Sequence, residues 1–163
     1  MTDFVQVEIR KLNEADLGLV EKAMPSQHHK KRFNTPNADY LIAWVDGEPI
    51  GHLLIRWGGS DNSFLLSKHL DYPYVEALGV RVDFWHRGIG TQLIQKAQDL
   101  AKVKGFGKIG VAVGLDNERA KGLYKKLGYV DSGFGEFEVN WDYSDDCGVE
   151  KSEGEICVYL VKE

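Results

Sequence analysis

Two glycines one residue apart, Gly88 and Gly90, lie in residues 85–91, the segment whose chemistry is easiest to interpret. The residues before it are rich in β-branched and aromatic side chains, as in a strand, and those after it repeat apolar side chains at helical spacing. Glycines at a strand-to-helix junction let the main chain approach a ligand, and the free amides of the first helical turn then face an anion. The segment predicts a pyrophosphate site; a tight turn that needs positive φ is the alternative.

A second segment, residues 117–129, makes this prediction more specific. Asn117 follows the hydrophobic residues 109–113 and is a typical helix N-cap, and Gly128 is a typical helix end. The apolar face between them consists of Ala120, Leu123, Tyr124 and Leu127. The strand up to Arg81, the helix from about Gly88 to Lys104 and the strand up to Val113 predict a right-handed crossover between parallel strands. Such units bind ligands at the carboxyl ends of their strands.

The two segments together resemble the GNAT superfamily of acyl-CoA-dependent N-acetyltransferases. Residues 80–90 are similar to its pyrophosphate motif, Arg/Gln-x-x-Gly-x-Gly/Ala, and residues 117–129 to its second block. Trp85 stands where the family most often has Arg or Gln, so the chain departs from the pattern at that side chain, whereas main-chain amides carry most of the binding. The resemblance extends from the N-terminus to about Tyr129, and beyond it only the strand pattern is shared.

The resemblance implies an α/β (α+β) fold: a twisted, mostly antiparallel mixed sheet of about six to seven strands, flanked by helices, with a parallel pair around the cofactor site. It implies acetyl-CoA as cosubstrate, with pantetheine along residues 78–80 and the Val80 amide first among its partners. Ordinary sheet pairing is the alternative there. The implied cofactor-binding residues are Leu78, Val80, His86, Arg87, Gly88, Ile89, Gly90, Thr91, Asn117 and Tyr124.

Two side chains are candidates for catalysis. Tyr124 lies on the inward helical face and matches the family tyrosine, and a phenol pKa of about 10 is close enough to a thiol pKa of about 8.5 for donation to the leaving thiolate. A structural core tyrosine is the alternative. Glu76 shares a strand face with Leu78 and Val80 if alternation is regular, which makes it a candidate general base; the alternative is an ion-paired or solvent-facing carboxylate.

Length and composition limit the possible classes. A chain of 163 residues predicts one domain, residues 1–163, able to bury roughly 70% of its unfolded surface. Two cysteines and five scattered histidines indicate neither a disulfide framework nor a metal site, which favours the cytoplasm. No apolar run approaches ~20 residues, and the N-terminus lacks a signal pattern, so we expect no membrane association. A net charge of −5 disfavours nucleic-acid binding.

Other parts of the chain predict the elements around the site. We expect an opening strand over residues 5–12, a helix between Asn13 and Pro25, and an antiparallel pair over residues 40–45 and 50–57, joined at Asp46 and Gly47. Gly51 predicts a bulge or a close main-chain approach. Residues 64–72 fit either a short helix or an irregular lid. The basic residues 28–32 fit a solvated face or, by resemblance, the border of the acceptor site.

The C-terminal part predicts a half-exposed strand around residues 137–141, an acidic loop over residues 142–154, and a final strand over residues 155–161. Trp141 and Tyr143 lie among the acidic residues. These features favour a small cationic amine as acceptor, through electrostatic focusing and cation-π contacts; a solvated acidic loop is the alternative. The acidic residues are Glu136, Glu138, Asp142, Asp145, Asp146, Glu150, Glu153 and Glu155.

The predicted function is transfer of an acetyl group from acetyl-CoA to a primary amine. We expect direct attack in a ternary complex, because neither Cys147 nor Cys157 has a nearby histidine in sequence. A protein N-terminal or lysine acetyltransferase is one alternative, and a catalytically silent acyl-CoA-binding module that senses the cofactor or binds a partner protein is another. The chain is expected to be a monomer or a homodimer.

Overall fold

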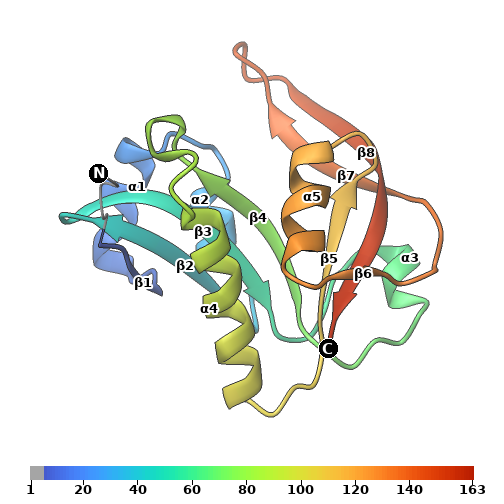
Figure 1. The fold of residues 1–163 in the computed structure, drawn as a ribbon. Coiled ribbons are helices and arrows are strands. Elements are labelled where there is room, and N and C mark those ends of the chain that lie inside the picture. Colours follow the sequence, from blue (N-terminus) through green and yellow to red (C-terminus); the bar gives the residue numbers. More distant parts are fainter. Residues whose placement is uncertain (1–5) are drawn as a thin grey trace.

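An eight-stranded sheet runs through residues 6–163, the part of the chain that this computed structural model describes (Figure 1). The strands follow the order β1-β2-β3-β4-β5-β8-β6, and β7 pairs with β8. Among the strands of these described residues, only the β4–β5 pair is parallel. The strands are β1 (Glu8–Lys11), β2 (Ala38–Val45), β3 (Glu48–Arg56), β4 (Tyr74–Val80), β5 (Ile109–Gly114), β6 (Val130–Asp131), β7 (Phe137–Ser144) and β8 (Glu150–Lys162). The predicted fold class is confirmed; the additional strand, β6, has two residues and no periodicity to reveal it.

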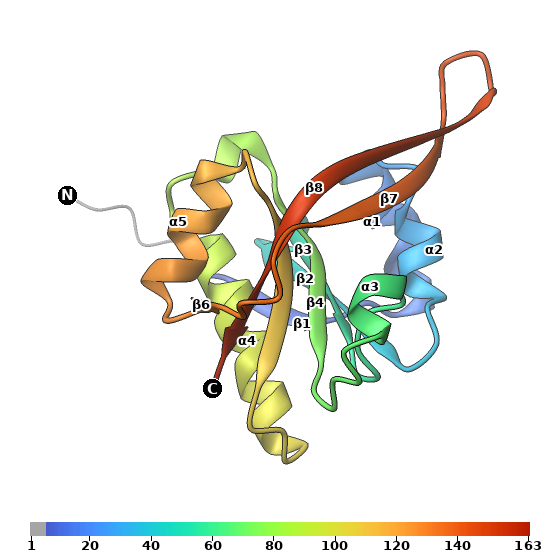
Figure 2. The ribbon, with the colours of Figure 1, turned by 90° about the vertical axis from the view of Figure 1, so that its right-hand side faces the viewer.

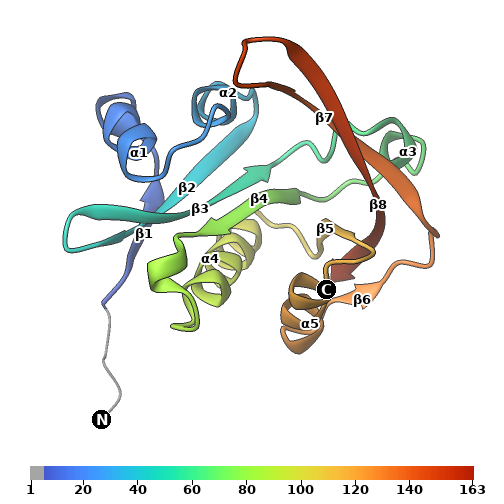
Figure 3. The same cartoon turned by 90° about the horizontal axis from the view of Figure 1, so that it is seen from above.

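The helices divide between the two faces of the sheet (Figure 3). The first group, α1 (Leu17–Ala23), α2 (His29–Phe33) and α3 (Ser63–Leu66), covers one face. The second group, α4 (Ile89–Val103) and α5 (Glu118–Lys126), covers the other. Two short 3-10 helices, η1 (Glu14–Asp16) and η2 (Val82–Phe84), precede α1 and α4. We call these faces the α1–α3 face and the α4–α5 face.

Asparagine caps begin the helices where the sequence predicts them. The Asn13 side chain accepts a hydrogen bond from the Asp16 amide at 3.0 Å, and the Asn117 side chain accepts one from the Ala120 amide at the same distance. Asn62 caps α3, so residues 64–72 begin with a short helix and continue as turns. The predicted opening strand is β1, and Val5, part of that prediction, lies outside the described residues.

The turn between β2 and β3 confirms the hairpin signal. Asp46 and Gly47 both have positive φ, 50° and 79°, as a type I′ turn requires. The predicted feature at Gly51 is confirmed in both forms. The β2–β3 register shifts between Ala43 and Trp44, opposite this end of β3, and a Cβ on Gly51 would lie 3.2 Å from the Gly79 carbonyl oxygen. This glycine therefore lets β3, β4 and α4 pack closely.

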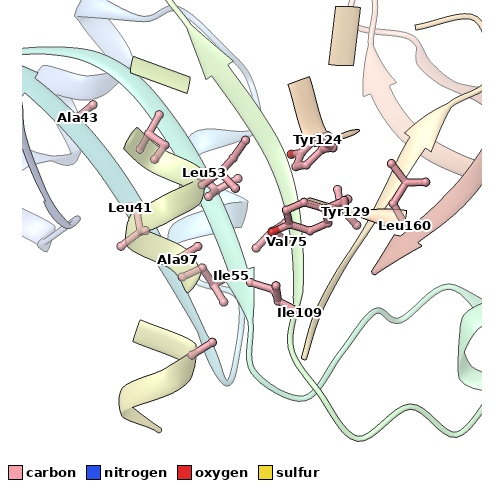
Figure 4. Packing of buried hydrophobic residues seen from close by; sticks show 14 of the residues in the cluster. Leu41, Ala43, Leu53, Ile55, Val75, Ala97, Ile109, Tyr124, Tyr129 and Leu160 are labelled. Atoms are coloured by element: carbon pink, nitrogen blue, oxygen red, sulfur yellow. The ribbon is translucent and has the colours of Figure 1, made fainter. Parts of the chain in front are cut away.

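The main core lies on the α4–α5 face, between the sheet and the helices α4 and α5 (Figure 4). The helix α4 contributes apolar side chains at helical spacing, and they pack on side chains from β2 to β5. Truncating one of the fully buried members, such as Leu93, to alanine costs about 2–5 kcal/mol by loss of burial and formation of a cavity. The buried residues of α4 are Ile89, Leu93, Ile94, Ala97 and Ala101.

The acidic C-terminal segment forms a β-hairpin, so the predicted loop over residues 142–154 is wrong. Strands β7 and β8 pair from Phe137 and Cys157 out to Ser144 and Glu150, and the hairpin projects from the body of the molecule (Figure 2). The Asp145 side chain closes the turn by accepting hydrogen bonds from two amides, each at 2.9 Å. Main-chain pairing and this local turn hold residues 142–154 as a hairpin. The acidic composition did not reveal it, because the outer half of an exposed hairpin needs no apolar residues.

Candidate functional site

The parallel strands β4 and β5 separate soon after they meet. They pair only at Tyr74 with Gly110 and at Val75 with Val111, and their carboxyl ends then diverge (Figure 1). The amide of Arg81 donates to the Ile50 carbonyl at 2.8 Å, so the preceding residue, Val80, directs its N–H and C=O away from β3 and toward the gap between β4 and β5. The Val80 main chain therefore faces the gap between β4 and β5 rather than a neighbouring strand.

The glycine turn at residues 86–88 joins η2 to α4. Gly88 is the N-cap of α4 with φ 76°, a left-handed conformation that favours glycine, and His86 also has positive φ. The first amide to bond within this helix end is that of Gln92, which donates to Gly88, so the amides of Ile89, Gly90 and Thr91 precede the helical ladder. This geometry fits the predicted anion site.

The two glycines of the turn have different roles. Gly88 needs its freedom of conformation, whereas a Cβ at Gly90 would meet only the tips of Leu123 and Leu78, at 3.8 and 4.0 Å, which are ordinary contact distances. The sequence does not distinguish them. An alanine fits at position 90. A larger or charged side chain there would therefore reduce the space for a ligand without straining the main chain.

Trp85 folds back from the turn onto β4. Its indole N–H donates a hydrogen bond to the Val80 carbonyl at 2.6 Å. The guanidinium carbon of Arg119, in the first turn of α5, lies 4.1 Å from the centre of the Trp85 rings. Trp85 thus links the β4–α4 connection to α5. These two contacts are the structural role of the tryptophan that stands where the motif usually has Arg or Gln.

A bulge in β4 separates Glu76 from the residues that follow it. Glu76 lies opposite Leu54, but Gly79 lies opposite His52, so β4 contains one extra residue, and Ala77 has φ 60°. Leu54 belongs to the core of the α1–α3 face, whereas Leu78 and Val80 pack on the core of the α4–α5 face. The expected shared face of Glu76 with these two residues is therefore wrong, because the bulge reverses the alternation.

The Glu76 carboxylate is ion-paired. Its Oε1 accepts a hydrogen bond from Arg56 Nε at 2.5 Å, and Arg56 also lies 3.8 Å from an Asp61 oxygen. Glu76 faces the α1–α3 side, directly before the bulge. This ion pair agrees with the ion-paired alternative that the sequence left open, and the role of Glu76 as a general base stays a prediction.

Tyr124 is buried in the core of the α4–α5 face, with 4% of its surface exposed. Its ring meets that of Tyr129 edge to face at 5.0 Å between centroids, and Figure 4 shows the pair close to Val75 of β4. Burial, with a smaller contribution from Tyr129, raises the pKa of Tyr124 well above its ordinary value. The raised pKa keeps the hydroxyl protonated and takes it further from the thiol pKa of about 8.5 than the sequence argument assumed. Within residues 6–163 the hydroxyl makes no side-chain hydrogen bond, so it is free to donate one.

The α1–α3 face carries a cluster of rings above β4. His29 is fully buried; its Nε2–H donates to the Met24 carbonyl, and its Nδ1 lies 2.7 Å from the Tyr40 hydroxyl. Arg32 donates to the same hydroxyl at 3.1 Å. His52 packs against His29 and donates from Nδ1 to the Ala77 carbonyl at 2.6 Å. His29 and Arg32 of the basic residues 28–32 therefore face inward, whereas a wholly solvated face was one of the two alternatives from the sequence.

The hairpin extends the same face beyond β5. Residues opposite one another on β7 and β8 share a face, which places Trp141, Tyr143, Glu153 and Glu155 on the side of the buried Phe137 and Cys157. A Cβ at Gly114, the last residue of β5, would lie 2.5 Å from a Glu155 carboxylate oxygen. The Glu155 carboxylate thus lies directly over the end of β5.

Two hydrogen bonds connect the hairpin to the α1–α2 connection. Gln27 donates to the Ser144 carbonyl at 3.1 Å and accepts from the Ser144 amide at 2.7 Å, and Figure 3 shows the hairpin passing over the sheet toward α2. The acidic and aromatic face of the hairpin and the histidine cluster therefore border the same side of the gap.

The predicted site residues fall into two groups. The glycine turn, the Val80 main chain, Asn117 and Tyr124 gather around the carboxyl ends of β4 and β5, whereas Glu76 lies on the α1–α3 face. Sequence reasoning missed His52 and Arg56, two polar residues that follow Glu48 in the mostly apolar strand β3; that composition was the available signal. In residues 6–163, no group of three or more His, Cys, Asp or Glu side chains could hold a metal, and no helix could span a membrane.

Comparison with known proteins agrees with this architecture. The family model described as the acetyltransferase (GNAT) family matches residues 7–129. The chain is also similar to a putative streptothricin acetyltransferase from Bacillus anthracis, solved with acetyl coenzyme A, with a TM-score of 0.68, 18% identity and 98% coverage of both chains.

Two further structures have the same fold. The ribosomal-protein-S18-alanine N-acetyltransferase from Escherichia coli has a TM-score of 0.65 and 16% identity, covering 96% of this chain and 92% of that one. Arabidopsis thaliana NAA60, solved with a bisubstrate analogue, has a TM-score of 0.62 and 18% identity, covering 96% and 97%. At these identities the similarity concerns the fold alone.

Proposed function

Because the chain belongs to the GNAT family of acetyltransferases, we propose that it transfers the acetyl group of acetyl-CoA to a primary amine by direct attack in a ternary complex. The observation that carries the proposal is the gap between β4 and β5. It is flanked by the free amides of α4 on one side and lies close to the Tyr124 hydroxyl on the other. Main-chain amides suited to an anion, main-chain groups suited to pantetheine and a hydroxyl suited to donate to sulfur support this proposal together.

The cofactor residues are proposed in three roles. The amides of residues 86–91 receive the pyrophosphate, with Arg87 adding positive charge at the exposed turn. The main-chain groups of Leu78 and Val80 receive the pantetheine. The Asn117 side-chain oxygen already caps α5, so its NH₂ group is the part left for the ligand.

The catalytic proposal assigns Tyr124 to the leaving group. As the C–S bond breaks, negative charge develops on sulfur, and the buried phenol donates a hydrogen bond to it. A raised pKa keeps this donor protonated. Glu76 is proposed to act near the acceptor amine, either as its proton acceptor or, through its bond with Arg56, as a fixed negative charge.

Direct attack is proposed because the cysteines offer no activated nucleophile. Cys157 is buried, and burial followed by Glu155 raises its pKa to about 12. Cys147 is exposed in the hairpin turn. Initial-rate kinetics should therefore show intersecting double-reciprocal lines, and parallel lines with an isolable acetyl-enzyme would contradict the ternary complex.

For the acceptor, we propose a small cationic amine. Glu153 and Glu155 lie with Trp141 and Tyr143 on the hairpin face that borders the gap, which offers negative charge and aromatic faces to a cation. Acetylation of a protein N-terminus or lysine is the second candidate. It is favoured by the Gln27–Ser144 contact, which joins the hairpin to the α1–α2 connection on the side where we propose that the acceptor binds. A cytoplasmic location and a monomeric or homodimeric state complete the proposal.

A thiol-release assay tests this function. Acetyl-CoA is offered with polyamines, aminoglycosides, amino acids and N-terminal peptides at two salt concentrations, and thermal shift measures cofactor binding in parallel. Stabilisation by acetyl-CoA together with turnover of a cationic amine is expected. Stabilisation without turnover of any amine would instead identify a silent acyl-CoA-binding module, and no stabilisation at saturating acetyl-CoA would refute the cofactor site.

A further inference from the structure

Amide formation releases a proton from the acceptor nitrogen, and we propose that Nε2 of His52 receives it. The proposal rests on the acetyl transfer proposed above and names a catalytic base for it. His52 lies in β3 on the α1–α3 face, outside every sequence motif of the site. Three features carry the inference: its position over β4, its fixed tautomer and the bonds that it keeps on protonation.

The His52 ring lies directly on the main chain of β4, next to the bulge. A Cβ built at Gly79 would lie 2.5 Å from Nε2 and 2.6 Å from Cε1 of this ring. Only a glycine leaves room for the imidazole at this point. The neighbouring Val80 directs its main-chain groups into the gap that we assign to pantetheine, so Nε2 lies above the strand along which the thioester would lie.

The hydrogen bond to Ala77 fixes the tautomer. A carbonyl oxygen only accepts hydrogen bonds, so the 2.6 Å contact places the proton of the neutral ring on Nδ1 and leaves a lone pair on Nε2. Nε2 has no hydrogen-bond partner within residues 6–163, and the side chain is only partly covered. A base oriented by a second bond in this way is a recurring arrangement in group transfer.

The surroundings favour the neutral ring. Tyr40 from β2 and His29 and Arg32 from α2 face it, and Glu76 lies on the same face of β4. Burial, followed by Arg32, lowers the pKa of His52 to about 4, so the lone pair is present at neutral pH. Such a weak base takes a proton only from a nitrogen already bonding to carbon, whose N–H is far more acidic than that of the free ammonium ion.

The step balances as follows. The amine lone pair forms the N–C bond to the thioester carbonyl, and the nitrogen passes one proton to His52 Nε2. The C–S bond then breaks, and its electron pair leaves on sulfur, which accepts a hydrogen bond from the Tyr124 hydroxyl. The proton on His52 passes to solvent and a proton from solvent reaches the thiolate, which yields the thiol and restores the neutral histidine.

His52 is better placed than Glu76 for this proton. Protonating Glu76 would disrupt its 2.5 Å ion pair with Arg56. Protonating His52 disrupts no bond, because Nδ1–H stays on the Ala77 carbonyl while Nε2 gains a hydrogen. Glu76 then acts as a fixed negative charge on the same face, which stabilises the positive charge that develops on the amine.

Two substitutions separate catalysis from support of the bulge. In His52→Asn the side-chain NH₂ takes the place of Nδ1–H and keeps the bond to Ala77, but the Nε2 base is lost. In His52→Ala both are lost, and a space opens that can admit imidazole. Glu76→Gln is compared with them, and His69→Asn is the matched control, since His69 is exposed and its φ of 53° suits asparagine. Each protein is assayed with the best amine from the panel.

His52→Asn should bind acetyl-CoA within about threefold of the parent yet lose on the order of 10²–10³-fold in kcat/KM for the amine. Imidazole should restore turnover of His52→Ala at least several-fold, and His69→Asn should match the parent. Parent-like turnover of His52→Asn, absence of imidazole rescue in folded His52→Ala, or a larger loss in Glu76→Gln would overturn the assignment. If the parent enzyme itself acetylates no amine, the proposed function fails, which is a result distinct from a loss confined to the His52 variants.

Discussion

The indole N–H of Trp85 donates a 2.6 Å hydrogen bond to the main-chain carbonyl of Val80. That carbonyl faces the gap between β4 and β5, where we propose that pantetheine binds. The same ring lies against Arg119 of α5. The Trp85 indole therefore occupies a main-chain acceptor that we propose for pantetheine, and we expect it to compete with the cofactor.

Trp85→Phe should strengthen acetyl-CoA binding. The substitution keeps an aromatic ring against Arg119 but removes the donor, so the Val80 carbonyl is free for the ligand. A net hydrogen bond is worth about 1 kcal/mol, which corresponds to roughly a fivefold lower Kd by calorimetry. Trp141→Phe, on the hairpin, is the control and should leave the Kd unchanged. Weaker binding in Trp85→Phe would mean that the indole contacts the bound cofactor instead.

Gly90→Asp should weaken acetyl-CoA binding about tenfold or more, whereas Gly90→Ala should leave it nearly unchanged. A Cβ at this position meets nothing closer than 3.8 Å, so the two variants differ in charge and length rather than in strain. A carboxylate beside the first amides of α4 repels a pyrophosphate and competes for the same donors. Equal affinity of the two variants, measured by thermal shift against acetyl-CoA concentration, would remove the anion from this turn.

Tyr124→Phe should lower kcat about 100-fold while acetyl-CoA affinity and unfolding free energy change little. The hydroxyl makes no hydrogen bond within residues 6–163, so its removal leaves no described partner unsatisfied. Single-turnover rates at saturating cofactor measure the chemical step. A parent-like chemical rate in this variant would return Tyr124 to a purely structural role.

The paired substitution Glu153→Gln and Glu155→Gln should raise KM for a cationic amine several-fold at low salt, with a smaller effect at high salt. Both carboxylates lie on the hairpin face that borders the gap. Glu138→Gln with Glu150→Gln is the control, since these two residues lie on the opposite hairpin face and their substitution removes the same amount of charge. Equal effects of the two pairs would show that net charge, rather than this face, acts on the acceptor.

Stability should fall as the pH drops from about 6.5 toward 4. The pKa of His52 is lowered in the fold from 6.5 to about 4, mainly by burial, so the unfolded chain binds a proton over this range before the folded one does. The contribution is complete above pH 6.5 and amounts to at most about 3 kcal/mol, because the partly covered ring is screened. Urea unfolding of His52→Asn across this range should show a shallower loss than the parent, and parallel curves would contradict it.

The sequence by itself determined the elements that depend on neighbouring residues. The caps at Asn13 and Asn117, the Asp46–Gly47 turn and the glycine N-cap at Gly88 are local choices of main-chain conformation, and each is where the sequence predicts it. The apolar periodicity of α4 and the crossover that follows β4 likewise require only the order of residues along the chain. These features place the glycine turn and Tyr124 near the same gap.

Only the tertiary structure decided which side chains share a face on the acceptor side. One inserted residue at Ala77 moved Glu76 away from Leu78, and this insertion depends on the register between β3 and β4, two strands that are distant in sequence. The same pairing placed His52 on Gly79, and pairing with β8 turned an acidic segment into a hairpin. Strand register is determined by long-range packing and main-chain hydrogen bonds, and a one-residue shift reverses every side chain beyond it, which local residue patterns do not specify.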